Sequence, residues 1–182
     1  IQLCRKIKTE FKTSHIPVIL LTAFSSPNNE IEGLESGAND YLSKPFEERL
    51  LKAKIKNILQ LRERIHQSFA ENMSTGQLEI AENSPDKYLL EKMMKIVQLR
   101  YSDPLFNVSV FIEELGISRS LLHKKLQSLV GQSAGRFIRN YRLNKAKEII
   151  SIHPGMNISE VAYSVGFNDP KYFTRCFTKR YG

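Results

Sequence analysis

Apolar positions recur at helical spacing in the last quarter of the chain, in two short segments separated by a glycine. The run 158–165 leads into Gly166, and a second segment rich in Lys and Arg follows from Pro170. Apolar residues three and four positions apart that stop at a glycine predict a helix, a tight turn and a second helix. This is the layout of a helix-turn-helix.

The same pattern occurs about fifty residues earlier, over 107–131. Apolar positions and glycines of the two copies coincide: Asn107 with Asn157, Leu115 with Val165, Gly116 with Gly166, Leu122 with Phe173, Leu126 with Phe177, and Gly131 with Gly182. Such a repeat predicts two helix-turn-helix units. The amphipathic stretch 133–152 between them predicts one long helix that joins the units.

The first sixty residues show a different pattern. A continuous apolar run, Ile16–Leu21, predicts a strand buried on both faces, as in a parallel sheet. Around it the pattern predicts helices over Leu3–Phe11 and Asn29–Ser36, a second strand over Asp40–Ser43, and a long helix from Glu47. The predicted fold class is therefore mixed: half of a doubly wound α/β sheet, then an all-α domain with two helix-turn-helix units joined by a long helix.

The predicted helix from Glu47 continues to Phe69. Its apolar residues fall on a seven-residue repeat: Leu51, Ile55, Ile58, Ile65 and Phe69. Two interpretations stay open, a coiled-coil arm between two protomers or a helix that packs on its own sheet and ends in a solvated tail. The polar stretch that follows predicts domains at 1–70 and 86–182 with a linker at 71–85, and Ser84 before Pro85 predicts a capped helix start.

Charge is distributed unevenly along the 182 residues, whose net charge is +8. Residues 1–60 hold 9 Lys and Arg against 7 Asp and Glu, residues 61–105 hold 6 against 7, and residues 106–182 hold 12 against 5. A basic domain joined to near-neutral segments favours a polyanionic partner such as nucleic acid. No apolar run approaches the roughly twenty residues that span a bilayer, and two distant cysteines and four scattered histidines predict no metal or cofactor in this chain.

Three motifs in the first part resemble a known family. The segments 17–23, 33–41 and 44–46 (PVILLTA, GLESGANDY and KPF) are similar to the C-terminal half of a response-regulator receiver domain. The resemblance implies that Thr22 and Lys44 contact a phosphoryl group, that Tyr41 is the switch aromatic residue and that Pro45 is cis. It places the family's acidic Mg²⁺ pair and acceptor Asp on strands before Ile1, so Mg²⁺ is expected only in the complete receiver, and residue 1 reads as a cut through a longer protein.

The repeated part resembles the AraC-type DNA-binding domain from Asn107 to Gly182, through segments such as 122–126 (LHKKL), 158–162 (ISEVA) and 172–177 (YFTRCF). The resemblance implies base contacts from Arg119, Ser120, His123, Lys124, Lys171, Thr174 and Arg175, and phosphate contacts from Lys125, Arg139, Lys179 and Arg180. Arg and Lys can donate to guanine, and hydroxyls suit either base type. Alternatives stay open: Ser120 as a cap, His123 and Lys125 as solvated surface residues, and Arg180 as a ligand of the family's final helix, which is expected just after Gly182.

These features predict a sequence-specific transcription regulator of a two-component phosphorelay, in which phosphorylation of the receiver controls operator binding by two helix-turn-helix units in adjacent major grooves. The parent is either a free response regulator or a hybrid sensor histidine kinase. The alternative is a module in which the receiver half and the Glu47–Phe69 helix form a homodimer and DNA contact is secondary. The chain shows no catalytic constellation, so it is not expected to be an enzyme. The expected partners are double-stranded DNA and a sensor kinase, and the expected location is the cytoplasm or the cytoplasmic end of a membrane-bound sensor.

Overall fold

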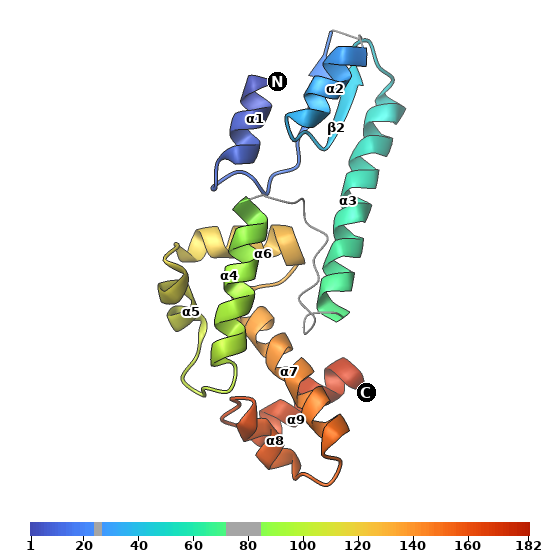
Figure 1. The fold of residues 1–182 in the computed structure, drawn as a ribbon. Helices are drawn as coiled ribbons and strands as arrows, with labels where there is room; N and C mark the ends of the chain where they lie inside the picture. Colours follow the sequence, from blue (N-terminus) through green and yellow to red (C-terminus); the bar gives the residue numbers. More distant parts are fainter. Residues whose placement is uncertain (24–26, 72–84) are drawn as a thin grey trace.

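The structure, a computed structural model, describes residues 1–23, 27–71 and 85–182. Helices and strands alternate in the first part, in the order α1 (Gln2–Thr9), β1 (Ile19–Thr22), α2 (Pro27–Glu35), β2 (Asp40–Ser43) and α3 (Glu48–Glu71). β1 and β2 pair in parallel, with Ile19 opposite Asp40 and Thr22 opposite Ser43. α3 runs from this small sheet down to the helical part of the molecule (Figure 1). The predicted partial α/β unit is confirmed.

The first strand differs from its prediction in extent and in burial. It begins at Ile19 rather than Ile16, and its side chains are half-buried or exposed, with Leu21 44% exposed. Within the described residues β1 has a single paired neighbour, β2. An interior strand of a larger parallel sheet is covered on both faces, and this environment is not provided for β1 here.

The second part is entirely helical in the described residues. Its elements are α4 (Pro85–Arg100), α5 (Val108–Leu115), α6 (Arg119–Val130), α7 (Ala134–Ile152), α8 (Ile158–Ser164) and α9 (Pro170–Tyr181). α5 and α6 form the first helix-turn-helix, α8 and α9 form the second, and α7 joins them (Figure 1). The predicted all-α domain with a long joining helix is confirmed.

The two units repeat each other in their capping as well as in their sequence. The Asn107 side chain accepts from the backbone N–H groups of Ser109 and Val110, and the Asn157 side chain accepts from the backbone N–H of Ser159 at the start of α8. Gly116 and Gly166 follow the first helix of each unit with φ of 70° and 81°. A non-glycine residue is strained in this left-handed region, so both turns depend on their glycine.

Most of the first core comes from α4 to α7. Its buried residues are Leu89, Leu90, Met93, Val97, Phe106, Phe111, Leu115, Leu122, Leu126, Val130, Phe137, Ile138 and Tyr141, with Ala134 at its edge. The buried face of α4 therefore packs on the helices of the first helix-turn-helix and on α7. A second, smaller core packs α8 and α9 on the end of α7 through Leu143, Ala146, Val161, Ala162, Val165, Phe167 and Phe173.

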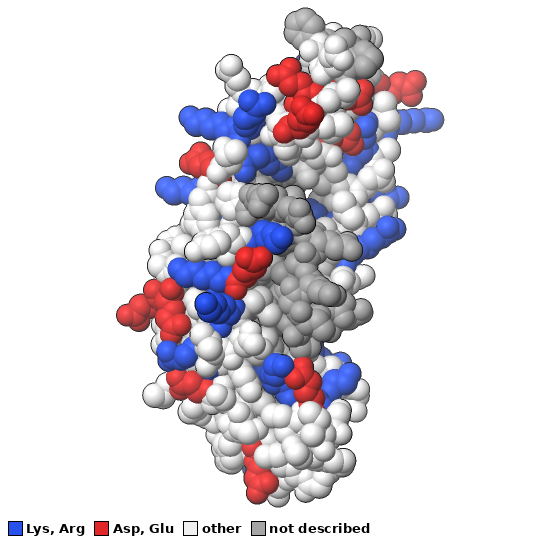
Figure 2. Space-filling view, viewed as in Figure 1, with Lys and Arg blue, Asp and Glu red and all other residues white. Residues whose placement is uncertain are grey.

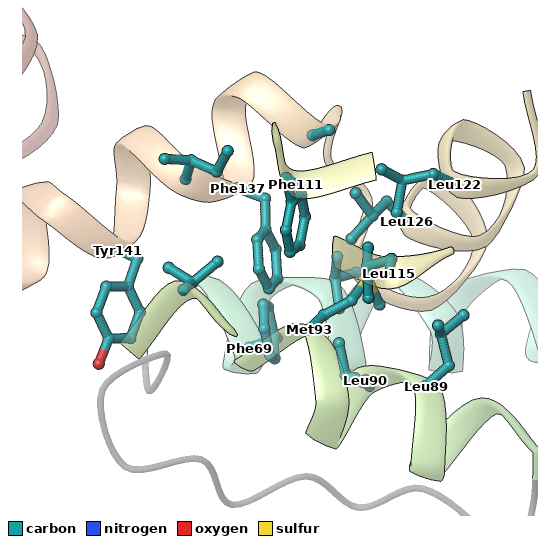
Figure 3. Packing of buried hydrophobic residues seen from close by; sticks show 14 of the residues in the cluster. Phe69, Leu89, Leu90, Met93, Phe111, Leu115, Leu122, Leu126, Phe137 and Tyr141 are labelled. Carbon is teal, nitrogen blue, oxygen red and sulfur yellow. The ribbon is translucent and has the colours of Figure 1, made fainter. Parts of the chain in front are cut away.

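One buried residue of the first core comes from the preceding part of the chain. Phe69, near the end of α3, is 3% exposed. Its ring stacks on Phe137 with centroids 5.9 Å apart, and Phe137 stacks in turn on Phe111 at 6.0 Å. Figure 3 shows these rings as one column through the core. The segment predicted as the first domain, 1–70, thus supplies an aromatic residue to the core of the second, while the predicted linker and its Ser84 cap lie almost wholly outside the described residues.

The heptad residues of α3 are divided between two environments. Phe69 is buried and Ile65 half-buried at the end that packs beside α6, whereas Ile55 is 42% exposed and its neighbour Leu59 56%. A continuous coiled-coil seam would need all of these positions facing a partner helix. The C-terminal end of α3 packs on helices of the same chain, so only the first half of α3 could form a coiled coil with a second protomer.

Arg142 ties α7 to the loop between α4 and α5. Its guanidinium donates to the carbonyl oxygens of Tyr101, Asp103 and Phe106 at 2.8, 2.7 and 3.1 Å. Burial lowers the pKa of Arg142, and the nearby Asp103 carboxylate opposes that shift. Among the basic residues of α7, Arg142 therefore stabilises the fold.

Candidate nucleic-acid interface

The first recognition helix, α6, presents its predicted base-reading residues to solvent. Ser118 caps the helix by accepting from the backbone N–H of Leu121 at 3.3 Å. Arg119, Ser120, His123 and Lys124 are all exposed. All four lie in the first turns of α6, whose Leu122 and Leu126 are buried in the core, so the helix offers exposed polar side chains that fit a major groove. The capping role weighed for Ser120 belongs to Ser118.

The second recognition helix, α9, is arranged in the same way. The Asp169 side chain accepts from the backbone N–H of Lys171 at 2.8 Å, and Pro170 occupies the first helical turn. Lys171, Thr174 and Arg175 are exposed, and Phe173 on the opposite side is 1% exposed. The Arg175 guanidinium lies over the ring of Tyr172, 5.3 Å from its centroid, which orients this side chain before any DNA is bound.

A basic cleft of about 580 Å³ separates α9 from the first half of α7. Its cationic lining residues are Arg136, Arg139, Arg175, Lys179 and Arg180, and no Asp or Glu is among the described residues that line it. Tyr172 also lines it: its hydroxyl accepts from Arg139 at 3.1 Å and its ring faces Arg175. The cleft brings together four residues predicted to contact DNA and can neutralise several phosphates at once.

Two residues outside the predicted contact set, Arg136 and Tyr172, also line this cleft. Tyr172 packs against the second core as well. The spacing of Arg136 and Arg139, three residues apart on one helix, is a signal that they share a face. Nothing in the sequence pattern indicated which face of α7 lies beside α9, because that depends on how the second unit packs.

The predicted phosphate contact of Lys125 is wrong for this arrangement of the chain. Its side chain is 0% exposed and its ammonium lies 2.5 Å from Asp86 of α4. It also donates to the Ser14 hydroxyl at 2.7 Å and lies over the ring of Phe11, 4.9 Å from the centroid. The interpretation of Lys125 as a solvated surface residue is wrong for the same reason, because a buried Lys is stable only with a partner.

Arg180 is held by the protein as well as lining the cleft. Its guanidinium donates to the carbonyl oxygen of Ala70 at 2.7 Å and to the side-chain oxygen of Asn144 at 3.0 Å. Lys179 is exposed on the same helix. Of the two, Lys179 is the side chain with freedom to follow a phosphate.

The predicted phosphoryl-switch residues Thr22 and Lys44 lie at neighbouring strand ends. Thr22 ends β1, and its carbonyl oxygen accepts from the backbone N–H of Lys44 at 2.6 Å. The Lys44–Pro45 peptide bond is cis, as expected. Tyr41 is 7% exposed and packs against Gly33 of α2. Asp40, which does not match the acceptor position, pairs with Lys54 at 2.7 Å.

The described residues do not fit a Mg²⁺ ion at this place. Mg²⁺ requires oxygen ligands, normally one or two carboxylates, whereas the strand ends supply a hydroxyl and an ammonium. No group of three His, Cys, Asp or Glu in the described part could hold a metal.

Charge on the face of the molecule that carries α4 is mixed. Figure 2 shows Lys and Arg interspersed with Asp and Glu over this face, without a continuous basic stripe. Among the described ion pairs, Arg100 pairs with Glu114 at 2.7 Å. The basic residues that could bind a polyanion lie instead along α6, α7 and α9. In the described part of the chain no helix combines the length and apolar character needed to cross a membrane.

Two family models match separate parts of the chain. Residues 1–56 match the response regulator receiver domain, and residues 111–182 match a helix-turn-helix domain. The chain therefore joins a segment that matches a receiver domain to a segment that matches a helix-turn-helix domain of the AraC type. Both matched families are regulatory rather than catalytic.

Several relatives share one or both parts. Histidine kinase P4 of Formosa agariphila is 42% identical over 180 residues, which is 99% of this chain but 13% of that protein. The transcriptional regulatory protein YrkP of Bacillus subtilis is 37% identical over 106 residues, covering 56% of this chain and 44% of that protein. A solved structure, the C-terminal domain of the two-component response regulator yesN from Fusobacterium nucleatum, is 30% identical with a TM-score of 0.46, covering 50% of this chain and 93% of that one. The chain therefore spans a small part of the first of these relatives and less than half of the second.

Proposed function

We propose that this chain is the output part of a two-component transcription regulator that binds double-stranded DNA through both helix-turn-helix units. The observation that carries the proposal is the placement of two capped recognition helices on one joining helix. α7 has 19 residues, so it is about 28 Å long at about 1.5 Å per residue. Successive major grooves on one side of DNA are about 34 Å apart, so one chain can serve both grooves.

Base readout and backbone contact make separable predictions. In this proposal Arg175 and the exposed polar side chains of α6 contact bases. Lys179 and Arg139, which line the basic cleft, contact phosphates. Arg175→Ala should weaken binding to a selected operator by about 1–3 kcal/mol and leave random DNA less affected. Lys179→Ala should weaken both alike and reduce the salt slope by about one. An equal loss on both DNAs for Arg175→Ala would remove it from base readout.

Control by phosphorylation is the second part of the proposal. Thr22 and Lys44 meet at the strand ends, where a hydroxyl and an ammonium suit a phosphoryl oxygen. In the intact parent protein, Lys44→Ala should remove the difference in operator affinity between the phosphorylated and unphosphorylated forms. If the difference is retained, Lys44 has no role in coupling phosphorylation to DNA binding. The phosphodonor would be a sensor kinase or a kinase domain of the same parent, and the site of action would be the cytoplasm.

A dimerisation module remains a second candidate function, favoured by apolar side chains exposed along α2 and α3. Ile31, Leu34, Leu50 and Leu61 are 46–58% exposed. If this surface forms a dimer and DNA contact is secondary, sedimentation should show dimers of the whole chain and monomers after removal of 1–71. The DNA-binding proposal instead requires that variants of α9 change operator affinity while the sedimentation coefficient is unchanged.

A further inference from the structure

A second cleft lies beside the first recognition helix, between α6 and the receiver part of the chain. Its volume is about 630 Å³. The loop before β1 contributes His15, and α3 contributes Arg62 and His66, while α6 contributes His123 and Lys124. Three of the chain's four histidines therefore line one cleft together with an arginine and a lysine.

The internal repeat relates this cleft to the basic cleft beside α9. In the alignment of the two units Lys124 corresponds to Arg175 and Ser128 to Lys179, and each residue lines the cleft beside its own helix. Both clefts therefore occupy the same flank of a recognition helix. The opposite wall is α7 in the second unit and the receiver part in the first.

The receiver wall is fixed to α6 by several hydrogen bonds. The Arg62 guanidinium donates to the carbonyl oxygens of Ser128 and His15 at 2.9 and 3.3 Å. The Ser128 hydroxyl donates to the carbonyl oxygen of His15 at 2.9 Å, and His66 Nε2 lies 3.0 Å from the Ser128 carbonyl oxygen. Gly131, at the end of α6, leaves room for His66, because a Cβ there would lie 2.7 Å from His66 Nδ1.

We infer that this second cleft binds the DNA phosphodiester backbone on the outer side of the first major groove, so that the receiver part is a third DNA-contacting surface. The inference rests on the proposed function. A helix in a major groove has a phosphate strand on either side, and phosphates are bound by cationic and hydrogen-bonding groups of the kind gathered here. The basic cleft beside α9 can bind the phosphates of one DNA strand. The second cleft, in the equivalent position beside α6, can bind the phosphates that flank the first major groove. Glu63 is the one acidic side chain among the described residues that line the cleft.

Glu63 gives the sharper test because its side chain is exposed and none of the described contacts between α3 and α6 uses it. Glu63→Lys should raise affinity for both selected and random-sequence duplexes about three- to tenfold and steepen the salt slope by about one. The matched control is Glu32→Lys, the same charge change on α2 of the receiver part, which should leave the salt slope nearly unchanged. Trimming the selected duplex on the flank beside α6 should remove the gain. Equal effects of the two substitutions, or a gain that survives trimming, would overturn the inference.

Arg62 tests the same cleft in the opposite direction. Arg62→Ala should weaken binding to both duplexes, and Arg64→Ala, an exposed position on the same helix that does not line the cleft, should do so much less. If the receiver part instead blocks DNA from reaching α6, Arg62→Ala should strengthen binding, which would contradict the inference. Thermal unfolding of each variant identifies any loss of affinity that comes from loss of fold.

The two proposals fail in different ways. If the unaltered chain binds no DNA, or binds it without dependence on Arg175, the proposed function is wrong. If Arg175→Ala weakens operator binding but neither Glu63→Lys nor Arg62→Ala changes the affinity, only the third contact surface is wrong.

Discussion

Phe69 should contribute to the stability of the DNA-binding half although it lies on the last helix of the receiver part. Its ring is 3% exposed and stacks on Phe137. Removing a fully buried aromatic side chain costs the transfer of its apolar surface from water, about 2–3 kcal/mol, and leaves a cavity that raises the total to about 3–5 kcal/mol. Phe69→Ala should therefore lower the free energy of unfolding by about that amount.

The matched control for Phe69→Ala is Leu61→Ala on the same helix. Leu61 is 58% exposed, so its truncation should change stability by no more than about 0.5 kcal/mol. Urea unfolding followed by circular dichroism measures both, because the signal comes mainly from the helices of the second part. A loss below about 1 kcal/mol for Phe69→Ala would refute the inclusion of α3 in this core.

Three further perturbations test other contacts in a denaturation series. Lys125→Ala should lower the free energy of unfolding by about 3–5 kcal/mol because it leaves Asp86 buried without its partner. Combining Lys125→Met with Asp86→Leu should recover most of that stability. A small loss for the single variant would show that the pair is solvated. Gly166→Ala should destabilise the protein far more than Gly116→Ala. Both glycines have a positive φ, but only at Gly166 would a Cβ clash with the backbone, 2.3 Å from a carbonyl oxygen. Equal losses of stability would show that the positive φ alone accounts for the effect. Burial lowers the pKa of His15, and the nearby Lys125 lowers it further. As the pH falls, His15 is therefore protonated in the unfolded chain before it is protonated in the folded one. Stability should fall as the pH drops below about 6.5. Thermal unfolding between pH 7.5 and about 5.5 should show a smaller fall for His15→Asn, and an identical pH profile would exclude this histidine.

Local sequence determined the helices of the second part and their turns. Asn107, Gly116, Asn157 and Gly166 cap or end helices through contacts within a few residues, and such contacts can be read from spacing. The same holds for the exposed rows of α6 and α9, because a helix that buries one side must present the other. The order of elements in the first part was also predictable from the alternation of apolar runs.

The tertiary structure decided what surrounds each side chain, and there the sequence pattern was insufficient. Lys125 carries a charge that is expected at the surface of α6, but α4 and the loop at Ser14 enclose it. Phe69 fits a coiled-coil repeat, but the end of α3 packs beside α6 and places its ring on Phe137. Both depend on contacts between residues far apart in the chain, which helical periodicity does not encode. The recognition helices were determined by the sequence itself, and the clefts beside them only by how α7 and the receiver part pack against those helices.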